Sequence, residues 1–272
     1  MKWYPVLFLF GTGLCNLYCQ QNEDGVETFK LIQFTDTHFG EAASKDNQSM
    51  AEMANLISYE MPQLVVLSGD VVSAVSFEPK KKKKKRGDFF LKKMFNIKKK
   101  FFFFFFFKYM FEMSETPWAY TLGNHDDQAD YNRTQIINYA VKQSYSLTQA
   151  GPTDIGGVSN YYLTVFNSAN QPIVNIWFMD SLDTNCYNVE GYGCVEFSTV
   201  EWYQQTSEKL EQTYGRKIPG IVYIHIPLPE VLMLWNNFAT AGTLQDTGVC
   251  CWSLNTGLFS VMQERGDIVS VW

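Results

Sequence analysis

Apolar runs at the start of the chain predict a strand, a helix and a second strand. Residues 29–34 ("FKLIQF") have the character of a short strand, and "QLVVLS" before Gly69 that of a buried strand. Between them, Ser49 to Tyr59 places its apolar residues at helical spacing. Parallel pairing needs such a crossover, so this β-α-β unit indicates two neighbouring parallel strands.

The later segments continue the α/β pattern. Further strands are predicted at 118–122, 161–166 and 173–179, in "GIVYIHIPLPE" and from residue 268 onward. Ser198 with Glu201 has the spacing of a capping box, which predicts a helix through Leu210. A short helix is expected to stop at Gly266. The order of elements predicts an α/β fold.

Residues able to bind metals follow the ends of these strands. Taken singly, each fits a turn, a helix cap or a surface histidine, but the chain has only 3 His and every one lies at or just after a strand end. In α/β sheets the carboxyl ends of strands converge on one crevice, so we expect these side chains to meet. They are Asp36, His38, Asp70, Asn124, His125, Asp126 and His225.

The chemistry of this set predicts phosphoester hydrolysis. Carboxylates and imidazoles without thiolates suit two divalent ions such as Zn, Mn or Fe. A carboxylate between two ligand sets can bridge ions about 3.5–4 Å apart, which activate water and clamp a phosphoryl group. His125 can then stay off the metals and protonate the leaving oxygen, while Asp126 orients its ring.

Composition limits the class of partner. The 272 residues suffice for one large α/β domain, and the formal net charge is −6. However, 13 of the 22 basic residues lie between Lys80 and Lys108, so elsewhere 9 basic residues face 27 acidic ones. No nucleic-acid-binding surface is expected on so acidic a body, and anionic membranes are equally poor partners. A phosphate ester remains as the expected partner.

Residues 78–107 form a low-complexity Lys/Phe insert. Seven consecutive Phe fit no amphipathic period and would aggregate if exposed. Lys and Phe are encoded by AAA and TTT, so an A/T-rich intron read as coding would give this pattern. We interpret the stretch as a gene-model artefact or a species-specific insert. A nuclear-localisation patch is the alternative, and it conflicts with the leader described next.

The first 19 residues resemble a secretory signal peptide, with Lys2 before an apolar stretch too short to span a membrane. Cleavage after Cys15 or Cys19 is possible, and a signal anchor is the alternative reading. The seven residues of the Phe run cannot cross a bilayer either, so no membrane span is expected in the mature chain. Two sequons, at Asn47 and Asn132, are candidate glycosylation sites. The expected location is outside the cell or in the lumen of the secretory pathway.

Four cysteines follow the leader, and an oxidising compartment would favour disulfides. Three pairings are open among Cys186, Cys194, Cys250 and Cys251. Cys186 with Cys194 would close a short loop, or each could pair with one of the later two. A metal site built from these thiols is the weaker interpretation, because no CxxC spacing occurs.

The motifs together resemble the calcineurin-like metallophosphoesterase family. "DTH", "GD" and "GNHD" occur in the family's order, followed by the strand that carries His225. "YTLGNHDDQAD", "HIPLPE" and "NTGLFSVMQERGD" are similar to the purple acid phosphatase 29-like branch. The resemblance covers residues 29–272 apart from the Lys/Phe insert. It implies a β-sandwich of two mixed sheets flanked by helices (α/β/β/α) and a phosphoesterase domain over that range.

The resemblance also implies a role for each candidate ligand. Asp36 and His38 would hold the first metal, Asp70 would bridge, and Asn124 with His225 would hold the second. Phosphate esters would be hydrolysed by metal-bound hydroxide, without a covalent intermediate. His125 would act on the substrate.

Two positions depart from the family pattern. True purple acid phosphatases carry a Tyr three residues after the bridging Asp; here that position is Ser73, so no purple Fe(III) centre is implied. The last metal motif, Gly-His-x-His, is absent, and "GDIVSVW" stops at Trp272. We therefore interpret the domain as C-terminally incomplete, with each metal lacking one imidazole. A non-catalytic or non-folding product of a faulty gene model is the alternative.

Overall fold

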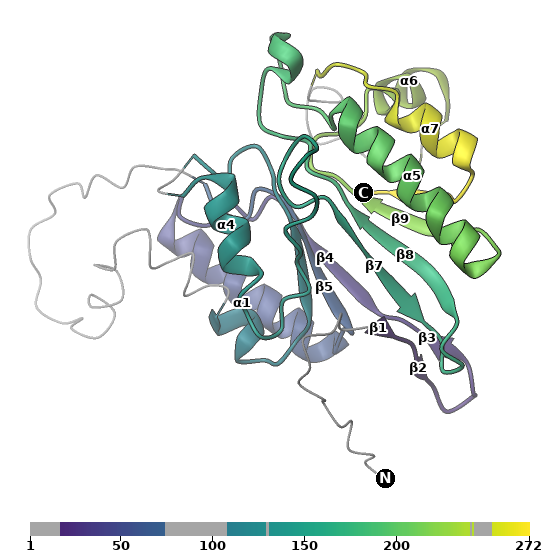
Figure 1. Ribbon diagram of the computed structural model, residues 1–272. Coiled ribbons are helices and arrows are strands. Elements are labelled where there is room, and N and C mark those ends of the chain that lie inside the picture. The colour runs from purple at the N-terminus through teal and green to yellow at the C-terminus, as the bar shows by residue number, and fades with distance from the viewer. Residues whose placement is uncertain (1–16, 74–107, 129–130, 240, 242–251) are drawn as a thin grey trace, which may run out of the picture.

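Two β-sheets pack face to face between two layers of helices (Figure 1). The structure, a computed structural model, describes residues 17–73, 108–128, 131–239, 241 and 252–272. Helices α1 and α4 cover one sheet, and α5 and α7 cover the other. This arrangement confirms the predicted α/β/β/α sandwich, although among the described strands only the second sheet is mixed and the first is parallel throughout.

The first sheet contains three parallel strands in the order β4-β5-β6. Their bounds are β4 (Leu31–Phe34), β5 (Leu64–Ser68) and β6 (Trp118–Thr121). Helix α1 (Ala43–Glu60) joins β4 to β5, as the β-α-β prediction requires. A π-helical turn, η1 (Lys108–Glu112), precedes β6, and α4 (Arg133–Ala140) follows it.

The second sheet is mixed and has the order β1-β7-β8-β9-β10. Only β7 and β8 pair antiparallel, and they form the predicted strand pair. The bounds are β1 (Leu17–Tyr18), β7 (Tyr161–Phe166), β8 (Pro172–Phe178), β9 (Gly220–Tyr223) and β10 (Ile268–Val271). A separate hairpin comprises β2 (Gln20–Gln21) and β3 (Glu27–Thr28). The remaining helices are η2 (Cys186–Asn188), α5 (Phe197–Tyr214), α6 (Glu230–Asn237) and α7 (Leu258–Arg265).

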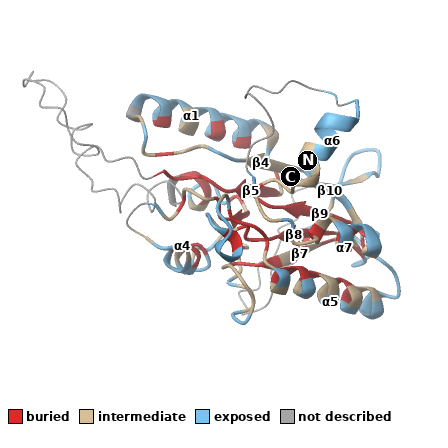
Figure 2. Cartoon of the chain, turned by 90° about the horizontal axis from the view of Figure 1, so that it is seen from above, coloured by how far each residue is buried: buried red, intermediate tan, exposed pale blue. Residues whose placement is uncertain are grey.

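Alternation along the strands produces three apolar layers. In β5, Val65 and Leu67 face α1 and α4, whereas Leu64 and Val66 face the second sheet. Trp177 of β8 points the other way, toward α5 and α7. Figure 2 shows buried residues concentrated in the strands, with exposed residues on the outer faces of α1 and α5. Burying each such side chain contributes about 1.5–3 kcal/mol, so both faces of each sheet are stabilised.

Two predicted helix starts differ from the structure. Helix α1 begins at Ala43 rather than near Ser49. The capping-box prediction for α5 is wrong: Glu196 is the N-cap, and Ser198 Oγ instead accepts a hydrogen bond from the Gly156 amide at 2.9 Å. That amide lies on a distant loop, which the local sequence pattern does not reveal. The predicted stop at Gly266 is confirmed by its left-handed φ of 62°.

The end of the predicted leader lies inside the fold. Leu17 and Tyr18 pair with Val165 and Phe166 of β7, and Leu17 is buried between the two sheets. Residues 1–16 and the Lys/Phe insert at 78–107 lie outside the described residues. Within the described part of the chain, no helix combines the length and apolar character needed to cross a bilayer.

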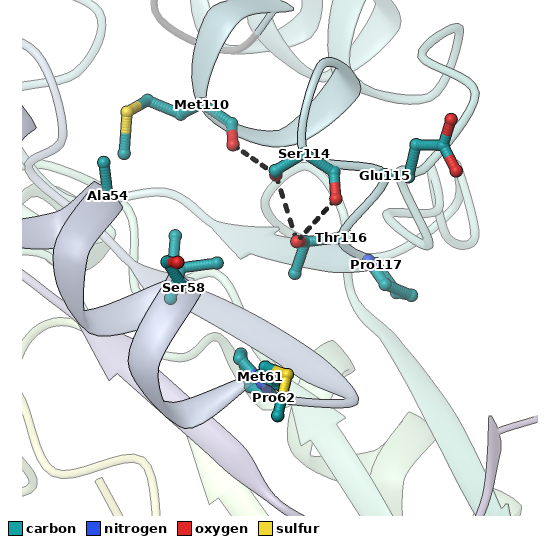
Figure 3. Close-up of a pocket in the computed structure, with 10 residues that line it drawn as sticks. Ala54, Ser58, Met61, Pro62, Met110, Ser114, Glu115, Thr116 and Pro117 are labelled. Atoms are coloured by element: carbon teal, nitrogen blue, oxygen red, sulfur yellow. Dashed lines mark hydrogen bonds between the residues drawn. The ribbon is translucent and has the colours of Figure 1, made fainter. Parts of the chain in front are cut away.

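A cavity of about 520 Å³ lies at the amino ends of β5 and β6 (Figure 3). Pro62 and Pro117, which precede these two strands, contribute to its wall, as do Met61 and Glu115. The candidate metal ligands follow the opposite, carboxyl ends of the same strands. This cavity is therefore separate from the site described below.

Candidate metal centre

Strands from both sheets deliver the candidate residues to one edge of the sandwich. In the first sheet, β4 leads to Asp36 and His38, β5 to Asp70, and β6 to Asn124. From the second sheet, β9 leads to His225. Contacts among these side chains, given below, show that the five residues predicted as metal ligands do meet.

Asp70 lies at the centre of the cluster, and its side chain is only 3% exposed. Its Oδ2 atom is 3.2 Å from His225 Nε2, 3.8 Å from His38 Nε2 and 4.0 Å from His125 Nε2. Its Oδ1 atom accepts a hydrogen bond from the backbone amide of His125 at 2.7 Å. One buried carboxylate thus faces all three histidines of the chain.

The other ligand candidates form two groups on either side of Asp70. Asp36, His38 and Asp70 each offer a ligand atom, and these atoms lie within 4.8 Å of one another. On the other side, Asn124 Oδ1 is 3.1 Å from His225 Nε2. The geometry therefore provides two adjacent sets that share Asp70.

The imidazoles of His38 and His225 each contact a second group through Nδ1, the ring nitrogen that faces away from Asp70. His225 Nδ1 donates to the Ser68 carbonyl at 3.0 Å, which turns Nε2 toward Asp70. His38 Nδ1 contacts Ser73 Oγ, while its Nε2 faces Asp36 and Asp70. Such second contacts fix the orientation of a ligating imidazole and its tautomer. Ser73, which occupies the position of the tyrosine in true purple acid phosphatases, therefore helps to orient His38.

The backbone around the cluster adopts conformations that ordinary residues rarely adopt. Asp36, His38 and Asp70 have φ values of 52°, 45° and 50°. Strained conformations of this kind cost on the order of 1–3 kcal/mol and concentrate at functional sites. The two glycines beside the ligands allow close approach: a Cβ at Gly69 would overlap the His225 ring, and one at Gly123 would overlap Asp70.

The electrostatics favour positive charge between the carboxylates. Burial raises the pKa of Asp70, but its hydrogen bond and charge interaction with His225 outweigh burial and lower the pKa overall. A hydrogen bond to Asp36 raises the pKa of His38. Burial lowers the pKa of His225, yet Asp70 more than compensates and the net shift is upward. The field that retains protons on these imidazoles would equally attract a divalent cation.

His125 faces a more open environment than the other two histidines. Its side chain is 41% exposed, compared with 8% for His225. Its ring centroid lies 5.5 Å from that of His38. This position lets a group outside the cluster reach the imidazole while the backbone amide stays bound to Asp70.

Asp126 does not have the surroundings expected of a group that orients the His125 ring. Its carboxylate is buried and accepts four backbone hydrogen bonds at 2.7–3.1 Å, from the amides of Asp70, Val71, Val72 and Gly123. Burial raises its pKa despite these bonds. The prediction for its role is corrected: the side chain points inward and ties the turn after β5 to the turn after β6.

Arg133 and Asp180 also contribute to this region, although neither was predicted. Arg133 Nη1 donates to the Gly123 carbonyl at 2.7 Å, and its guanidinium pairs with Asp180. In the sequence, Arg133 is the middle residue of the "NRT" sequon, which drew attention only to Asn132. A long-range ion pair leaves no local signal from which either residue could have been found.

The donor set fits divalent metal ions. The oxygen and imidazole ligands suit Zn, Mn or Fe, and no thiolate is among them. The shared carboxylate of Asp70 suits a pair of ions better than a single one. Asp36, His38, Asp70, Asn124 and His225 are the residues that could hold them.

The remaining candidates lie away from this cluster. The structure joins Cys186 to Cys194 in a disulfide, which is the short-loop pairing; Cys250 and Cys251 lie outside the described residues. Asn47 is exposed on α1, and Asn132 is exposed at the N-cap of α4, where its Oδ1 accepts from the Gln135 amide.

Comparison with known proteins agrees with this geometry. Residues 29–252 match the family model described as calcineurin-like phosphoesterase. The chain belongs to the calcineurin-like phosphoesterase family. Among solved structures, a dimetal phosphatase from Danio rerio shares the fold, with a TM-score of 0.54 and 10% identity over 89% of this chain and 80% of its own.

The sequence is also similar to plant proteins named as purple acid phosphatases. It is 30% identical to probable inactive purple acid phosphatase 29 of Arabidopsis thaliana over 90% of this chain, and 28% identical to probable inactive purple acid phosphatase 14 over 92%. The yeast phosphatase DCR2 of Saccharomyces cerevisiae is 26% identical over 78% of this chain and 36% of its own length. The chain spans 65% of the length of the two plant relatives. These matches support the purple acid phosphatase 29-like branch.

Proposed function

We propose that this protein is a dinuclear-metal-dependent phosphoesterase that hydrolyses phosphate esters. The observation that carries the proposal is Asp70, whose buried carboxylate lies between two sets of oxygen and nitrogen donors. Membership of the calcineurin-like phosphoesterase family supports the same chemistry. The names of the two plant relatives include the word inactive, so catalysis in this chain requires its own experiment.

The roles proposed for the ligands follow their positions. Asp36 and His38 would hold one ion, Asn124 and His225 the other, and Asp70 both. When bound, two divalent ions would supply Lewis-acid activation of the ester and of a water molecule. The neutral amide of Asn124 limits the negative charge facing an anionic substrate.

His125 is the proposed proton donor to the leaving oxygen. Its imidazole is the most exposed of the three and lies beside the ligand cluster rather than within it. A donor in this place can contribute roughly 10²–10⁴-fold to the rate. Asp126 contributes indirectly, because its carboxylate accepts hydrogen bonds from the backbone amides of Asp70 and Gly123 and so holds together the two turns that carry Asp70 and His125.

A hydrolysis assay with an aryl phosphate tests this function on the full chain. Enzyme stripped with chelator and resupplied with Mn²⁺ or Zn²⁺ should show metal-dependent turnover. Asp70→Asn should abolish it together with metal binding, whereas His125→Ala should lower kcat by about 10²–10⁴-fold and retain both ions. Unchanged turnover in both variants would contradict the assigned roles.

A non-catalytic metal-binding protein is the second candidate function. It is favoured by the ligand count, since the proposed scheme gives each ion only three protein ligands, one of them shared. Metal analysis of the purified protein separates the two candidates. Two bound ions without turnover would favour binding alone, and two ions with turnover would exclude it.

We also propose that the chain enters the secretory pathway. The apolar leader, the Cys186–Cys194 disulfide and the exposed sequons at Asn47 and Asn132 support this route. The strand β1 bears on the choice of cleavage site. Cleavage after Cys15 would leave Leu17 in the core, whereas cleavage after Cys19 would remove β1 from the sheet.

A further inference from the structure

The backbone of Gly123 is held through both its N–H and its carbonyl, immediately before Asn124 and His125. Its amide donates to Asp126 Oδ2 at 2.7 Å, and its carbonyl accepts from Arg133 Nη1 at 2.7 Å. The position of the next two side chains therefore depends on two separate anchors. Asp126 connects the peptide to the turn after β5, so the first anchor lies within the same sheet.

The second anchor crosses to the other sheet. Arg133 begins α4, on the side of the first sheet, and pairs through Nη2 and Nε with both oxygens of Asp180, which follows β8. The side chain of Arg133 is 12% exposed and that of Asp180 is fully buried. Asp180 is itself fixed, because it accepts from the amides of Val158 at 2.7 Å and Leu182 at 2.8 Å.

This ion pair lies where the two halves of the site must be aligned. Asn124 belongs to the first sheet and His225 to the second, and their side-chain atoms are 3.1 Å apart. His225 follows β9, which is the direct neighbour of β8. Fixing the end of β8 against the Gly123 carbonyl therefore fixes the relative position of Asn124 and His225.

We propose that Arg133 is a positioning residue that, through Asp180 and the Gly123 carbonyl, aligns Asn124 and His125 with the second-sheet half of the site. This proposal rests on the proposed phosphoesterase function. Among the residues that the structure describes, Arg133 hydrogen-bonds to Asp180 and to the Gly123 carbonyl and to no candidate ligand side chain, so its effect is transmitted through the Gly123–Asn124 peptide. Misplacement of a reacting group by about 1 Å can cost on the order of 10²-fold in rate, so a small shift of this peptide is sufficient.

A purely structural ion pair is the competing explanation, and lysine distinguishes the two. A lysine at position 133 keeps the charge beside Asp180 and most of the apolar stem. It lacks the planar fork, so it cannot bind both Asp180 oxygens and the Gly123 carbonyl together. If the pair is only structural, the positive charge and the packed stem of lysine should suffice. If Arg133 positions the site, the guanidinium is required, because it alone binds Asp180 and the Gly123 carbonyl at the same time.

The experiment compares Arg133→Lys with Arg265→Lys in the full chain. Arg265 is a matched control: it is also 12% exposed, pairs with Glu211 at 2.6 Å, and lies in the α5–α7 layer on the far side of the second sheet. With aryl phosphate and saturating Mn²⁺, Arg133→Lys should lower kcat by roughly tenfold to a hundredfold and leave KM within about twofold. Arg265→Lys should leave kcat unchanged.

The chain has only 3 His, so imidazole NMR signals of the Zn²⁺-bound protein report each half of the site. Arg133→Lys should shift the His125 and His225 signals more than that of His38, whose ring lies beside His125 but follows β4. Unchanged kcat and unchanged signals would overturn the proposal, as would an equal response of the control. If the parent chain binds metal but has no turnover, the proposed function fails, while the NMR comparison still decides the positioning role.

Discussion

At the scale of single residues, Asp126 shows how one buried side chain can organise the candidate metal centre without being one of its ligands. Its two carboxylate oxygens satisfy four backbone amides from two different turns. Those turns carry Asp70 on one side, and Asn124 with His125 on the other. The ligand geometry is therefore determined partly by a residue buried beneath it.

Replacing Asp126 by Asn should destabilise the fold strongly. The amide group would direct N–H donors at backbone N–H donors, and a lost hydrogen bond to a charged group costs about 1.5–3 kcal/mol. We expect the free energy of unfolding to fall by about 2–4 kcal/mol in a denaturant titration.

Asp154→Asn is the control for this change, because Asp154 is exposed and its substitution should have an effect within about 0.5 kcal/mol. Equal stability of the two variants would show that the buried carboxylate does not hold the turns. A loss of kcat without a loss of stability would restore the earlier view that Asp126 orients the His125 ring.

At the scale of secondary-structure elements, the end of α1 contains a conformational defect remote from the site. Met61 is the C-cap of this helix and has φ 45° and ψ 60°. Helices commonly end with glycine in this left-handed conformation, because other residues are strained there. Met61 is also 75% exposed, so its side chain contributes little to the core.

Met61→Gly should therefore stabilise the protein. We expect a gain of about 1 kcal/mol, seen as a rise of roughly 2–4 °C in the thermal midpoint. Met113→Gly serves as the comparison, since Met113 is also exposed but is not among the positive-φ residues. A lower midpoint for Met61→Gly than for the parent chain would show that the strain is not real.

The elements also show which features a sequence reveals. Val65 to Ser68 and the helix before them could be predicted, since buried strands and helical spacing are local patterns. Convergence of Asp70 and His225 followed from their places after strand ends. By contrast, the Ser198–Gly156 bond and the four amides around Asp126 depend on segments that meet only after folding. Almost every residue has a backbone N–H, so no sequence motif indicates which amides will bind a given side chain.

At the scale of the whole molecule, the site is a junction between two sheets, and its ligands should stabilise the entire domain. A ligand that binds only the folded state adds about 2.7 kcal/mol at a concentration one hundred times its Kd. Zn²⁺ or Mn²⁺ should therefore raise the thermal midpoint of chelator-stripped protein in a concentration-dependent manner, and excess chelator should reverse the rise.

Asp70→Asn should lose this metal-dependent stabilisation, because Asp70 is the carboxylate that both ligand sets share. Asp154→Asn should retain it. The measurement is a thermal melt at several metal concentrations, and it needs no substrate. The same metal response in Asp70→Asn and in the parent chain would place metal binding elsewhere on the protein.

The strand order of the second sheet has a consequence for the lifetime of the assembled centre. β9, which His225 follows, pairs with β8 on one side and with β10 on the other. Segments with few buried apolar contacts open locally more often than a whole domain unfolds. β10 alternates half-buried and exposed side chains, whereas every residue of β5 is buried. The His225 half of the centre therefore follows a strand that pairs with a poorly buried one, and amide exchange should be faster along β10 than along β5.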